Sequence, residues 1–547
     1  MLKGQLKHIV LCGSKPAPGC RNEFDAMARR VADPEQPVRD SAGNTRSMYV
    51  YLPASGVIPC SSGIVVMRDG GDEDSARQLL ERTGWAECAE RDHYVVLLPN
   101  PAPGGWNLPD AQDGPDDIAF ARHWVTTATQ QYLLGCKAHR TSIYLAGFGR
   151  AASLAAGMVR RYGALLAGVY LENAAMPMPE SDSSFAPAPA WLVDCDEKLE
   201  QSIGDAAKKA GFGYRCFHDP KQPLHRQAWD ALFLGLRRWP TGGNGTVTHK
   251  STPEEMGLTT FEHETFLGDN GGLPHTWYEF APFNPTGEKL PLVLCLHGGG
   301  TSARYCAEQN RWHELGAKYG FYVVYPHCCA NAVWNAGCDP ECPNDEEYLL
   351  ALYRYLMEKY PIDPGRVYCT GFSMGSLMTQ CMGMLHGELF AAIAPFSGYL
   401  FPSYWEGPET NEKQPFELTA RRLAWMQQAQ ADGRDTRMPA IQFHGDCDNT
   451  WDGDAGVHTR SYWAQRNQVA EPDLENPTRR EGADQRFSVH DCCDADGNCL
   501  YRFVSVAGLP HAVDLRQPQM AWTFLSAFSR NPDGSLQIRG QKSEITK

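Results

Sequence analysis

Short apolar runs alternate along this chain with longer stretches in which apolar residues recur every three or four positions. Runs such as GIVVM (63–67) and LVLCL (292–296) are typical of strands buried on both faces of a sheet. Stretches such as DEEYLLALYRYLMEKY (345–360) predict amphipathic helices. This alternation predicts an α/β fold with a mostly parallel sheet flanked by helices.

The same order of elements occurs twice. Residues 142–173 (SIYLAGFGRAASLAAGMVRRYGALLAGVYLEN) and 366–398 (RVYCTGFSMGSLMTQCMGMLHGELFAAIAPFSG) each predict a strand, a turn, a helix and a second strand. Each is preceded by a similar series of predicted strands and helices. The sequence therefore predicts two tandem domains of one fold.

The boundary is expected in the polar, glycine-rich segment PTGGNGTVTHKSTPEE (240–255). A chain of 547 residues is too long for one ordinary core, because single cores stop growing at about 250–300 residues. We place the domains at 1–245 and 246–547. The second alone carries an aromatic-rich insert at 399–437, which we interpret as a lid over a site with an apolar acyl pocket.

The formal net charge of −15, without a cluster of Lys and Arg, argues against a nucleic-acid or anionic-membrane partner. No apolar run approaches the roughly 18–20 residues that span a bilayer. The first residues contain only a short apolar run, so we expect a first strand instead of a signal peptide, and a cytoplasmic protein.

Nineteen cysteines, an odd number, favour reduced thiols over a disulfide framework. Two groups of cysteines raise the alternative of a zinc site, but neither has paired C-x-x-C spacing. We expect no metal and no cofactor. The two groups are Cys328, Cys329, Cys338 and Cys342, and Cys492, Cys493 and Cys499, the latter in a predicted hairpin with a DGN turn.

The second repeat contains the chemistry-bearing motif G-x-S-x-G at 371–375. It lies between a predicted strand and a predicted helix, the context of the nucleophile elbow of α/β-hydrolases. Two glycines leave room for a sharp turn that exposes Ser373. We therefore predict two tandem α/β-hydrolase-type domains, with Ser373 as nucleophile.

A serine hydroxyl needs a base to take its proton and a carboxylate to orient that base. Asp448 and His511 follow Ser373 in the order nucleophile, acid, base, and each comes after a predicted strand. The alternatives left open are Asp446 and Asp452 for the acid and His444 for the base.

A run of glycines after the predicted strand 292–296 supplies candidate oxyanion donors. We predict the amides of Gly299, within the sequence HGGG at 297–300, and of Met374. A phosphate-binding loop is the alternative, but the lysine and spacing of a P-loop are missing. Expected substrate contacts come from His297, Trp334, Trp405 and Trp451.

Together, LHGGG, WNAG, GFSMGS, HGDCD and LPHAV resemble motifs of the polyhydroxybutyrate depolymerase and feruloyl esterase group of α/β-hydrolases, which includes family 1 carbohydrate esterases. The resemblance covers most of residues 260–530. It implies a metal-free serine esterase that cleaves small hydroxycinnamoyl, acetyl or hydroxyalkanoate esters, with Ser373, His511 and Asp448 as nucleophile, base and acid.

In the first repeat Gly149 replaces Ser373, and the oxyanion run reads RDGGD. His225 and Asp196 persist, but neither can activate a glycine, so we expect an inert copy. Such a copy would pack against its neighbour, shape its entrance or mediate homo-oligomerisation; a ligand pocket using Arg150 and His225 is the alternative.

Two other functions stay open at this stage. A peptidase of the prolyl oligopeptidase type shares the fold and triad, but that family carries a β-propeller in its first half, and no blade period is present here. A non-catalytic scaffold with an inherited triad would not require the elbow, the glycine run and His511 together.

Overall fold

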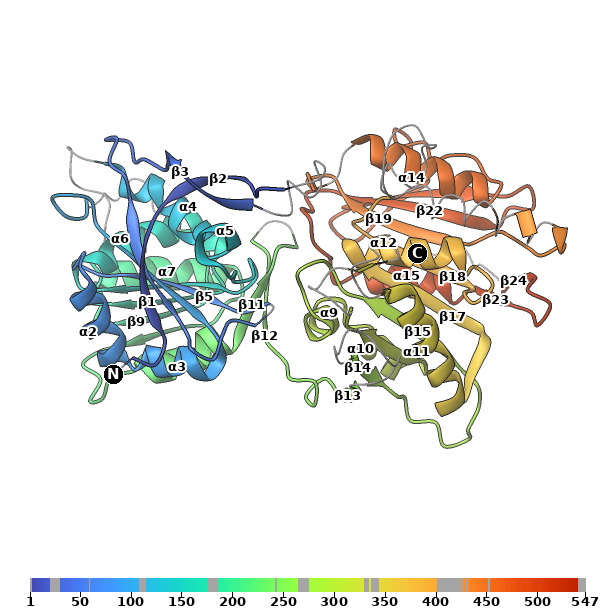
Figure 1. Cartoon of the computed structure of the whole chain (residues 1–547), viewed down its shortest axis with the longest axis horizontal. Coiled ribbons are helices and arrows are strands. Elements are labelled where there is room, and N and C mark those ends of the chain that lie inside the picture. Colours follow the sequence, from blue (N-terminus) through green and yellow to red (C-terminus); the bar gives the residue numbers. More distant parts are fainter. Residues whose placement is uncertain are drawn as a thin grey trace. The chain divides into compact units, whose positions relative to one another are not determined.

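The computed structural model describes residues 2–19, 30–58, 60–107, 115–175, 185–241, 244–263, 275–328, 334–335, 344–400, 424, 427–428, 431–450 and 453–539. They form two compact units. The N-terminal unit comprises Met1–Trp239 and Asn244–Lys250, and the C-terminal unit comprises Pro240–Gly243 and Ser251–Lys547 (Figure 1). Each contains a large, mostly parallel sheet flanked by helices, which confirms the predicted fold class.

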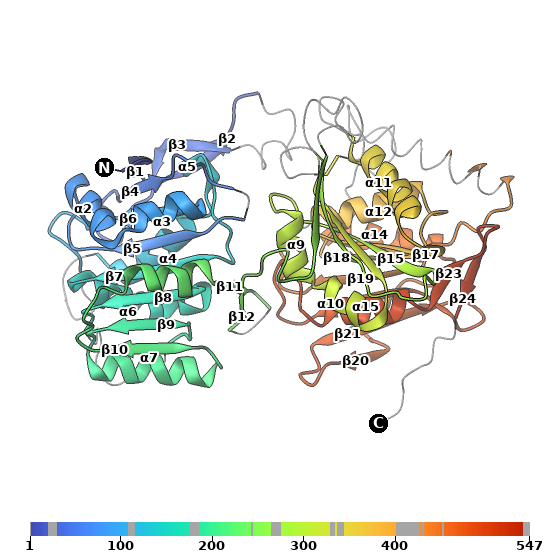
Figure 2. The ribbon, with the colours of Figure 1, turned by 90° about the horizontal axis from the view of Figure 1, so that it is seen from below.

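The N-terminal unit is built on an eight-stranded sheet whose strand order Figure 2 shows from β1 to β10. The first two pairings are antiparallel and the other five are parallel. In spatial order the strands are β1 (Gln5–Val10), β4 (Ser47–Leu52), β6 (Val95–Pro99), β5 (Gly63–Met67), β7 (Ile143–Phe148), β8 (Gly168–Glu172), β9 (Ala190–Val193) and β10 (Tyr214–Phe217).

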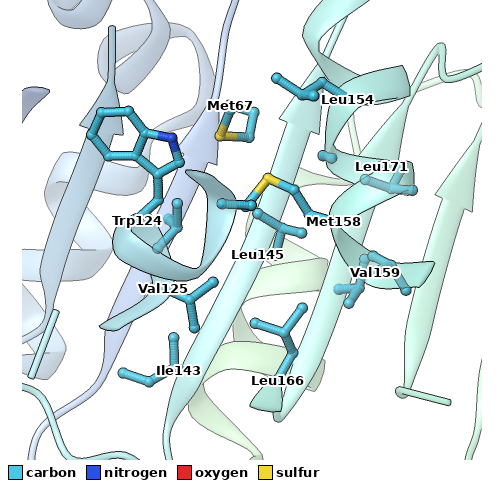
Figure 3. Close-up of a cluster of buried hydrophobic side chains, with 14 of the residues drawn as sticks. Met67, Trp124, Val125, Ile143, Leu145, Leu154, Met158, Val159, Leu166 and Leu171 are labelled. Carbon is cyan, nitrogen blue, oxygen red and sulfur yellow. The ribbon is translucent and has the colours of Figure 1, made fainter. Parts of the chain in front are cut away.

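Helices cover both faces of this sheet, and each face has its own apolar core. One core includes α4 (Asp117–Thr127), α6 (Arg150–Tyr162) and α7 (Glu197–Lys209). Figure 3 shows part of it, where Met158 of α6 lies beside Leu145 of β7, and Trp124 of α4 lies toward Met67 of β5. The other core includes α2 (Glu73–Thr83), α3 (Trp85–Asp92), α8 (His225–Ala228) and the π-helical turn Trp229–Leu234.

The C-terminal unit has a ten-stranded sheet with five parallel pairings in its centre and antiparallel pairings at both edges. In spatial order the strands are β13 (Thr259–His263), β14 (His275–Phe280), β16 (Tyr322–Pro326), β15 (Leu290–Leu296), β17 (Ile362–Phe372), β18 (Ala392–Phe396), β19 (Ala440–Gly445), β22 (Cys499–Val506), β21 (Phe487–Cys493) and β20 (Arg479–Glu481). The antiparallel pair β21–β22 confirms the predicted hairpin.

This sheet is also covered on both faces. One core includes α9 (Ala303–Asn310), α10 (Trp312–Tyr319) and α15 (Gln517–Leu525). The other includes α11 (Asp345–Lys359), α12 (Met374–Leu385) and α14 (Gly453–Arg466). Most of the predicted lid at 399–437 lies outside the described residues.

Smaller elements complete the described part of the chain. They are α5 (Gln131–Leu134), the 3-10 turn Gly163–Leu165, and the strand pairs β2 (Cys12–Pro16) with β3 (Arg30–Pro37), β11 (Leu236–Trp239) with β12 (Thr246–His249), and β23 (Phe528–Arg530) with β24 (Leu536–Ile538). Within the described ranges, every helix is too short or too polar to cross a membrane.

The two sheets share one strand order over seven positions. The series β4-β6-β5-β7-β8-β9-β10 matches β14-β16-β15-β17-β18-β19-β22, with one antiparallel pairing followed by five parallel ones in each. Register extends the match to single residues, because Met67 pairs with Gly147 as Leu296 pairs with Gly371. The residue after each of these strand ends, Arg68 and His297, therefore holds an equivalent position.

Candidate active site

The G-x-S-x-G motif forms a sharp turn between β17 and α12. Ser373 has φ 56° and ψ −117°, a left-handed conformation that is costly for any residue other than glycine. Its backbone N–H donates to the carbonyl oxygen of Phe396 at 2.9 Å, which holds the turn against β18. The turn places Ser373 at the carboxyl end of a central strand and at the N-terminus of α12.

The two flanking glycines are required by close backbone approach. A Cβ at Gly371 would lie 2.3 Å from the Gly375 carbonyl oxygen, and a Cβ at Gly375 would lie 2.2 Å from the Leu296 carbonyl oxygen. Neither neighbour is a flexible side chain that can move aside. Glycine at both positions is therefore a steric condition for the turn.

Three predicted residues come together in one hydrogen-bonded chain. His511 Nε2 lies 2.8 Å from Ser373 Oγ, and His511 Nδ1 lies 2.7 Å from Asp448 Oδ2. With the proton on Nδ1, the ring donates to the carboxylate, and Nε2 accepts the hydroxyl hydrogen of Ser373. The Phe372 ring packs 4.8 Å from the His511 ring and restricts its tilt.

The Asp448 side chain is fully buried, whereas His511 is 15% exposed. Burial raises the pKa of Asp448, but hydrogen bonds from His511 and from the Thr450 amide outweigh it, so the net pKa lies below the ordinary value. The carboxylate is therefore ionised at neutral pH and favours the Nδ1–H tautomer of His511.

The alternative candidates for the acid and the base have other partners where the structure describes them. Asp446 Oδ1 accepts a hydrogen bond from the Gly508 amide at 2.6 Å. His444 stacks on Tyr399 at 4.5 Å, and burial lowers the pKa of His444 to about 4. Asp452 lies outside the described residues. Among the described candidates, only Asp448 and His511 make the bonds that orient and deprotonate Ser373.

The glycine run after β15 lies against the start of α12. A Cβ at Gly299 would be 2.7 Å from Met374 Cγ, and a Cβ at Gly298 would be 3.1 Å from the Phe372 ring. Thr301 fixes the run, because its amide and its hydroxyl both donate to the Gly298 carbonyl oxygen, at 3.2 and 2.6 Å. The structure thus brings the predicted oxyanion residues Gly299 and Met374 together.

His297 and Trp334, which we predicted to contact the substrate, are buried and support this run from inside the unit. His297 is completely buried; its Nδ1 lies 2.8 Å from the Gly298 carbonyl oxygen and its Nε2 accepts from the Cys328 amide. Trp334 Nε1 donates to the His297 carbonyl oxygen at 2.7 Å. Burial lowers the pKa of His297 to about 3, so the ring is neutral. The other two predicted contacts, Trp405 and Trp451, lie outside the described residues.

The cysteine groups show no metal site in the part of the chain that the structure describes, because no three His, Cys, Asp or Glu side chains there could share an ion. Cys493 pairs in register with Cys499 across the β21–β22 hairpin. Cys329, Cys338 and Cys342 lie outside the described residues.

The N-terminal unit retains the turn without the serine. Gly149 has φ 63° and ψ −137°, close to the conformation of Ser373. The Asp69 carboxylate accepts hydrogen bonds from the amides of Arg150 and Ala151, at 3.2 and 2.8 Å. By strand register Asp69 stands where the C-terminal unit has Gly298. A carboxylate therefore fills the space in front of this helix, and a Cβ at Gly149 would lie 2.5 Å from Asp69 Oδ2.

His225 and Asp196, which persist in the N-terminal unit, have separate hydrogen-bond partners. His225 Nε2 lies 2.8 Å from Glu172 Oε2, which also accepts from the Tyr170 hydroxyl. Asp196 instead caps α7 by accepting from the amides of Lys198 and Leu199. Sequence reasoning missed Asp69 and Glu172; the Asp in RDGGD, where HGGG has glycine, was the available signal for Asp69.

Comparison with known proteins places the C-terminal unit among esterase-like sequences. Residues 277–468 match the family model described as esterase PHB depolymerase. Feruloyl esterase B of Talaromyces stipitatus is 30% identical over 140 residues, which are 25% of this chain and 38% of that protein. Poly(3-hydroxyalkanoate) depolymerase C of Paucimonas lemoignei is 34% identical over 116 residues, 20% of this chain and 28% of that protein. The matches thus span less than half of either relative.

One solved structure is also similar over part of the chain. The acetyl xylan esterase from Aspergillus awamori covers 49% of this chain and 99% of its own, with 18% identity and a TM-score of 0.36.

Replacing Gly149 by serine is expected to destabilise the N-terminal unit by about 1–3 kcal/mol, because the new Cβ meets the Asp69 carboxylate. Gly211→Ser is the matched control, since Gly211 also has positive φ (75°) but has no atom within 4 Å of a Cβ. Hydrogen exchange of β7 and α6 amides measures the change. Equal destabilisation by both substitutions would contradict the expected steric clash between the new side chain and the Asp69 carboxylate.

Stability of the C-terminal unit is expected to depend on pH through Asp448. Folding lowers the pKa of this carboxyl, so its ionised form stabilises the folded state above its ordinary pKa, and this stabilisation is lost as the pH falls through the lower folded value. The stability difference between wild type and Asp448→Asn should be constant above about pH 5 and shrink below about pH 4. Hydrogen exchange of β19 and β22 amides tests this; a difference independent of acid pH would refute it.

Proposed function

We propose that the C-terminal unit is a serine carboxylic-ester hydrolase. The observation that carries the proposal is the continuous chain Ser373–His511–Asp448, with contacts of 2.8 and 2.7 Å, on a strained turn at the end of a central strand. Such an arrangement is costly to hold and is suited to activating a hydroxyl. The match of residues 277–468 to an esterase family model supports it.

In the proposed reaction, Ser373 Oγ attacks the ester carbonyl carbon while His511 Nε2 takes the hydroxyl proton. The tetrahedral oxyanion is stabilised by the amides of Gly299 and Met374. His511 then gives its proton to the departing alcohol, leaving an acyl group on Ser373. Water, deprotonated by His511, releases the acid and restores the serine. Asp448 stabilises the imidazolium formed in each half.

We propose small hydroxycinnamoyl, acetyl or hydroxyalkanoate esters as substrates. The names of the relatives support these acyl groups: feruloyl esterases, acetylxylan esterases and a poly(3-hydroxyalkanoate) depolymerase each match a part of the chain. The alternative of a propeller-bearing peptidase lacks support, because the described strands of the N-terminal unit form an open, mostly parallel sheet.

We further propose that the N-terminal unit is a duplicated copy that has lost its chemistry. The shared strand order and the glycine in the place of Ser373 support this origin. Asp69 supports the loss, because its carboxylate lies on the helix-start amides that a hydrolase needs for the oxyanion. The double variant Ser373→Ala/Gly149→Ser should accordingly remain inactive.

Hydrolysis of p-nitrophenyl acetate and butyrate, methyl ferulate and a hydroxybutyrate oligomer tests the assignment, with an aminoacyl-proline amide as the peptidase probe. Ser373→Ala or His511→Ala should lower kcat by a factor on the order of 10⁴ or more, because both groups act in each chemical step. Asp448→Asn should cost on the order of 10⁴, through the wrong imidazole tautomer. Asp446→Asn is the matched control and should cost less than about tenfold.

Ester hydrolysis that persists in Ser373→Ala would contradict the proposed nucleophile. Amide cleavage in preference to every ester would contradict the esterase. Loss of activity in Asp446→Asn, with Asp448→Asn unaffected, would reverse the assignment of the acid.

A further inference from the structure

The N-terminal unit has a pocket of about 300 Å³ beside the turn at Gly149. Its walls come from the loop after β5, one face of α2 and the end of β7. Open α/β sheets bind ligands at this edge, outside the carboxyl ends of their strands. The volume is at the lower end of the range for small-molecule sites.

One wall carries a buried guanidinium group. Arg68 is 3% exposed; its two terminal nitrogens donate to Ser75 Oγ and Asn100 Oδ1, each at 2.8 Å, and its buried Nε has no acceptor among the described residues. Both acceptors are neutral, and within the described ranges Arg68 forms no ion pair. The charge of Asp72 acts on this guanidinium without an ion-pair contact. A buried positive charge without a direct carboxylate contact is costly.

Another part of the lining combines charge with apolar surface. The Arg82 guanidinium lies 5.3 Å from the centroid of the Phe148 ring and has no carboxylate within ion-pair distance in the described structure. Leu79, one turn earlier on α2, lines the same pocket. A ligand here would meet a cation and an apolar surface together.

The acidic groups around the pocket already have partners. Both oxygens of Asp69 accept from helix-start amides, and Glu172 is bonded to His225 and Tyr170. Asp72 caps α2 through the Ser75 amide. With two arginines and one aspartate in its lining, the pocket has a formal charge of +1. Because Asp69 occupies the N-terminus of α6, an anion in the pocket would be met by the arginines.

We propose that this pocket binds a small monocarboxylate with an apolar body, its carboxylate facing the guanidinium groups of Arg68 and Arg82 and its body against Leu79 and Phe148. This differs from the pocket predicted from sequence, since neither Arg150 nor His225 lines it. The inference is independent of the proposed esterase activity, because binding requires no turnover.

Isothermal titration of the full-length chain with benzoate tests the proposal, and benzamide is the neutral ligand of the same shape. Arg82→Gln should raise the Kd for benzoate by about tenfold or more, the effect of losing one charge-assisted hydrogen bond. Arg77→Gln is the matched control, because Arg77 also lies on α2 but pairs with Glu73 and does not line the pocket. It should leave the Kd within about twofold.

Benzamide should bind at least about tenfold more weakly than benzoate. Arg82→Lys keeps the charge and tests the planar geometry if the glutamine variant folds poorly; its Kd should lie between those of wild type and Arg82→Gln. Equal benzoate affinity in wild type and Arg82→Gln would overturn the proposal. Benzoate binding at the C-terminal site alone would give this result. The absence of saturable binding at millimolar benzoate, or displacement of benzoate by equimolar inorganic phosphate, would also overturn the proposal.

Discussion

The close backbone contact at the end of β17 is the constraint on which the candidate site depends. Gly371 and Gly375 let the chain turn back within van der Waals distance of β15, and Ser373 is held in a left-handed conformation at the apex. The other groups reach it because parallel strands end at one edge of the sheet. The glycine run follows β15, Asp448 follows β19 and His511 follows β22, so three loops from separate parts of the chain converge on one hydroxyl.

The N-terminal unit has the same backbone constraint without the serine. A Cβ at Gly147 would lie 2.8 Å from the Ala152 Cα, and Gly149 keeps positive φ, so β7 and α6 approach each other as β17 and α12 do. The first backbone N–H groups of α6, like those of any helix, have no acceptor within the helix itself. Asp69 satisfies two of them with its own carboxylate. In the C-terminal unit glycine at that position leaves the same region open, as oxyanion stabilisation requires.

The sequence predicted features that depend on neighbouring residues better than contacts between residues far apart along the chain. The elbow depends on residues within five positions, and its glycines and the adjoining apolar strand were sufficient to identify it. Asp446 and Asp448 both lie in the loop after one predicted strand. The choice between them depends on which carboxylate faces His511, and the sequence does not show this. The sequence did not indicate the partner of His225, because Glu172 reaches it from the end of β8, far away along the chain. The supporting role of His297 and Trp334 was also missed, because two of their hydrogen bonds join residues more than 30 positions apart and leave no periodic signal.

One pair of equivalent residues shows how the same backbone acquires opposite chemistry. Arg68 and His297 both follow the strand beside the elbow, and both are buried and hydrogen-bonded. Burial lowers the pKa of each, to about 10 for Arg68 and about 3 for His297. The imidazole is therefore neutral at physiological pH, whereas the guanidinium keeps its charge. Beside Ser373 the support is neutral, so in the proposed reaction only backbone amides would stabilise the oxyanion. Beside Gly149 the support is charged and Asp69 occupies the corresponding amides, so the proposed carboxylate ligand would be bound by side chains.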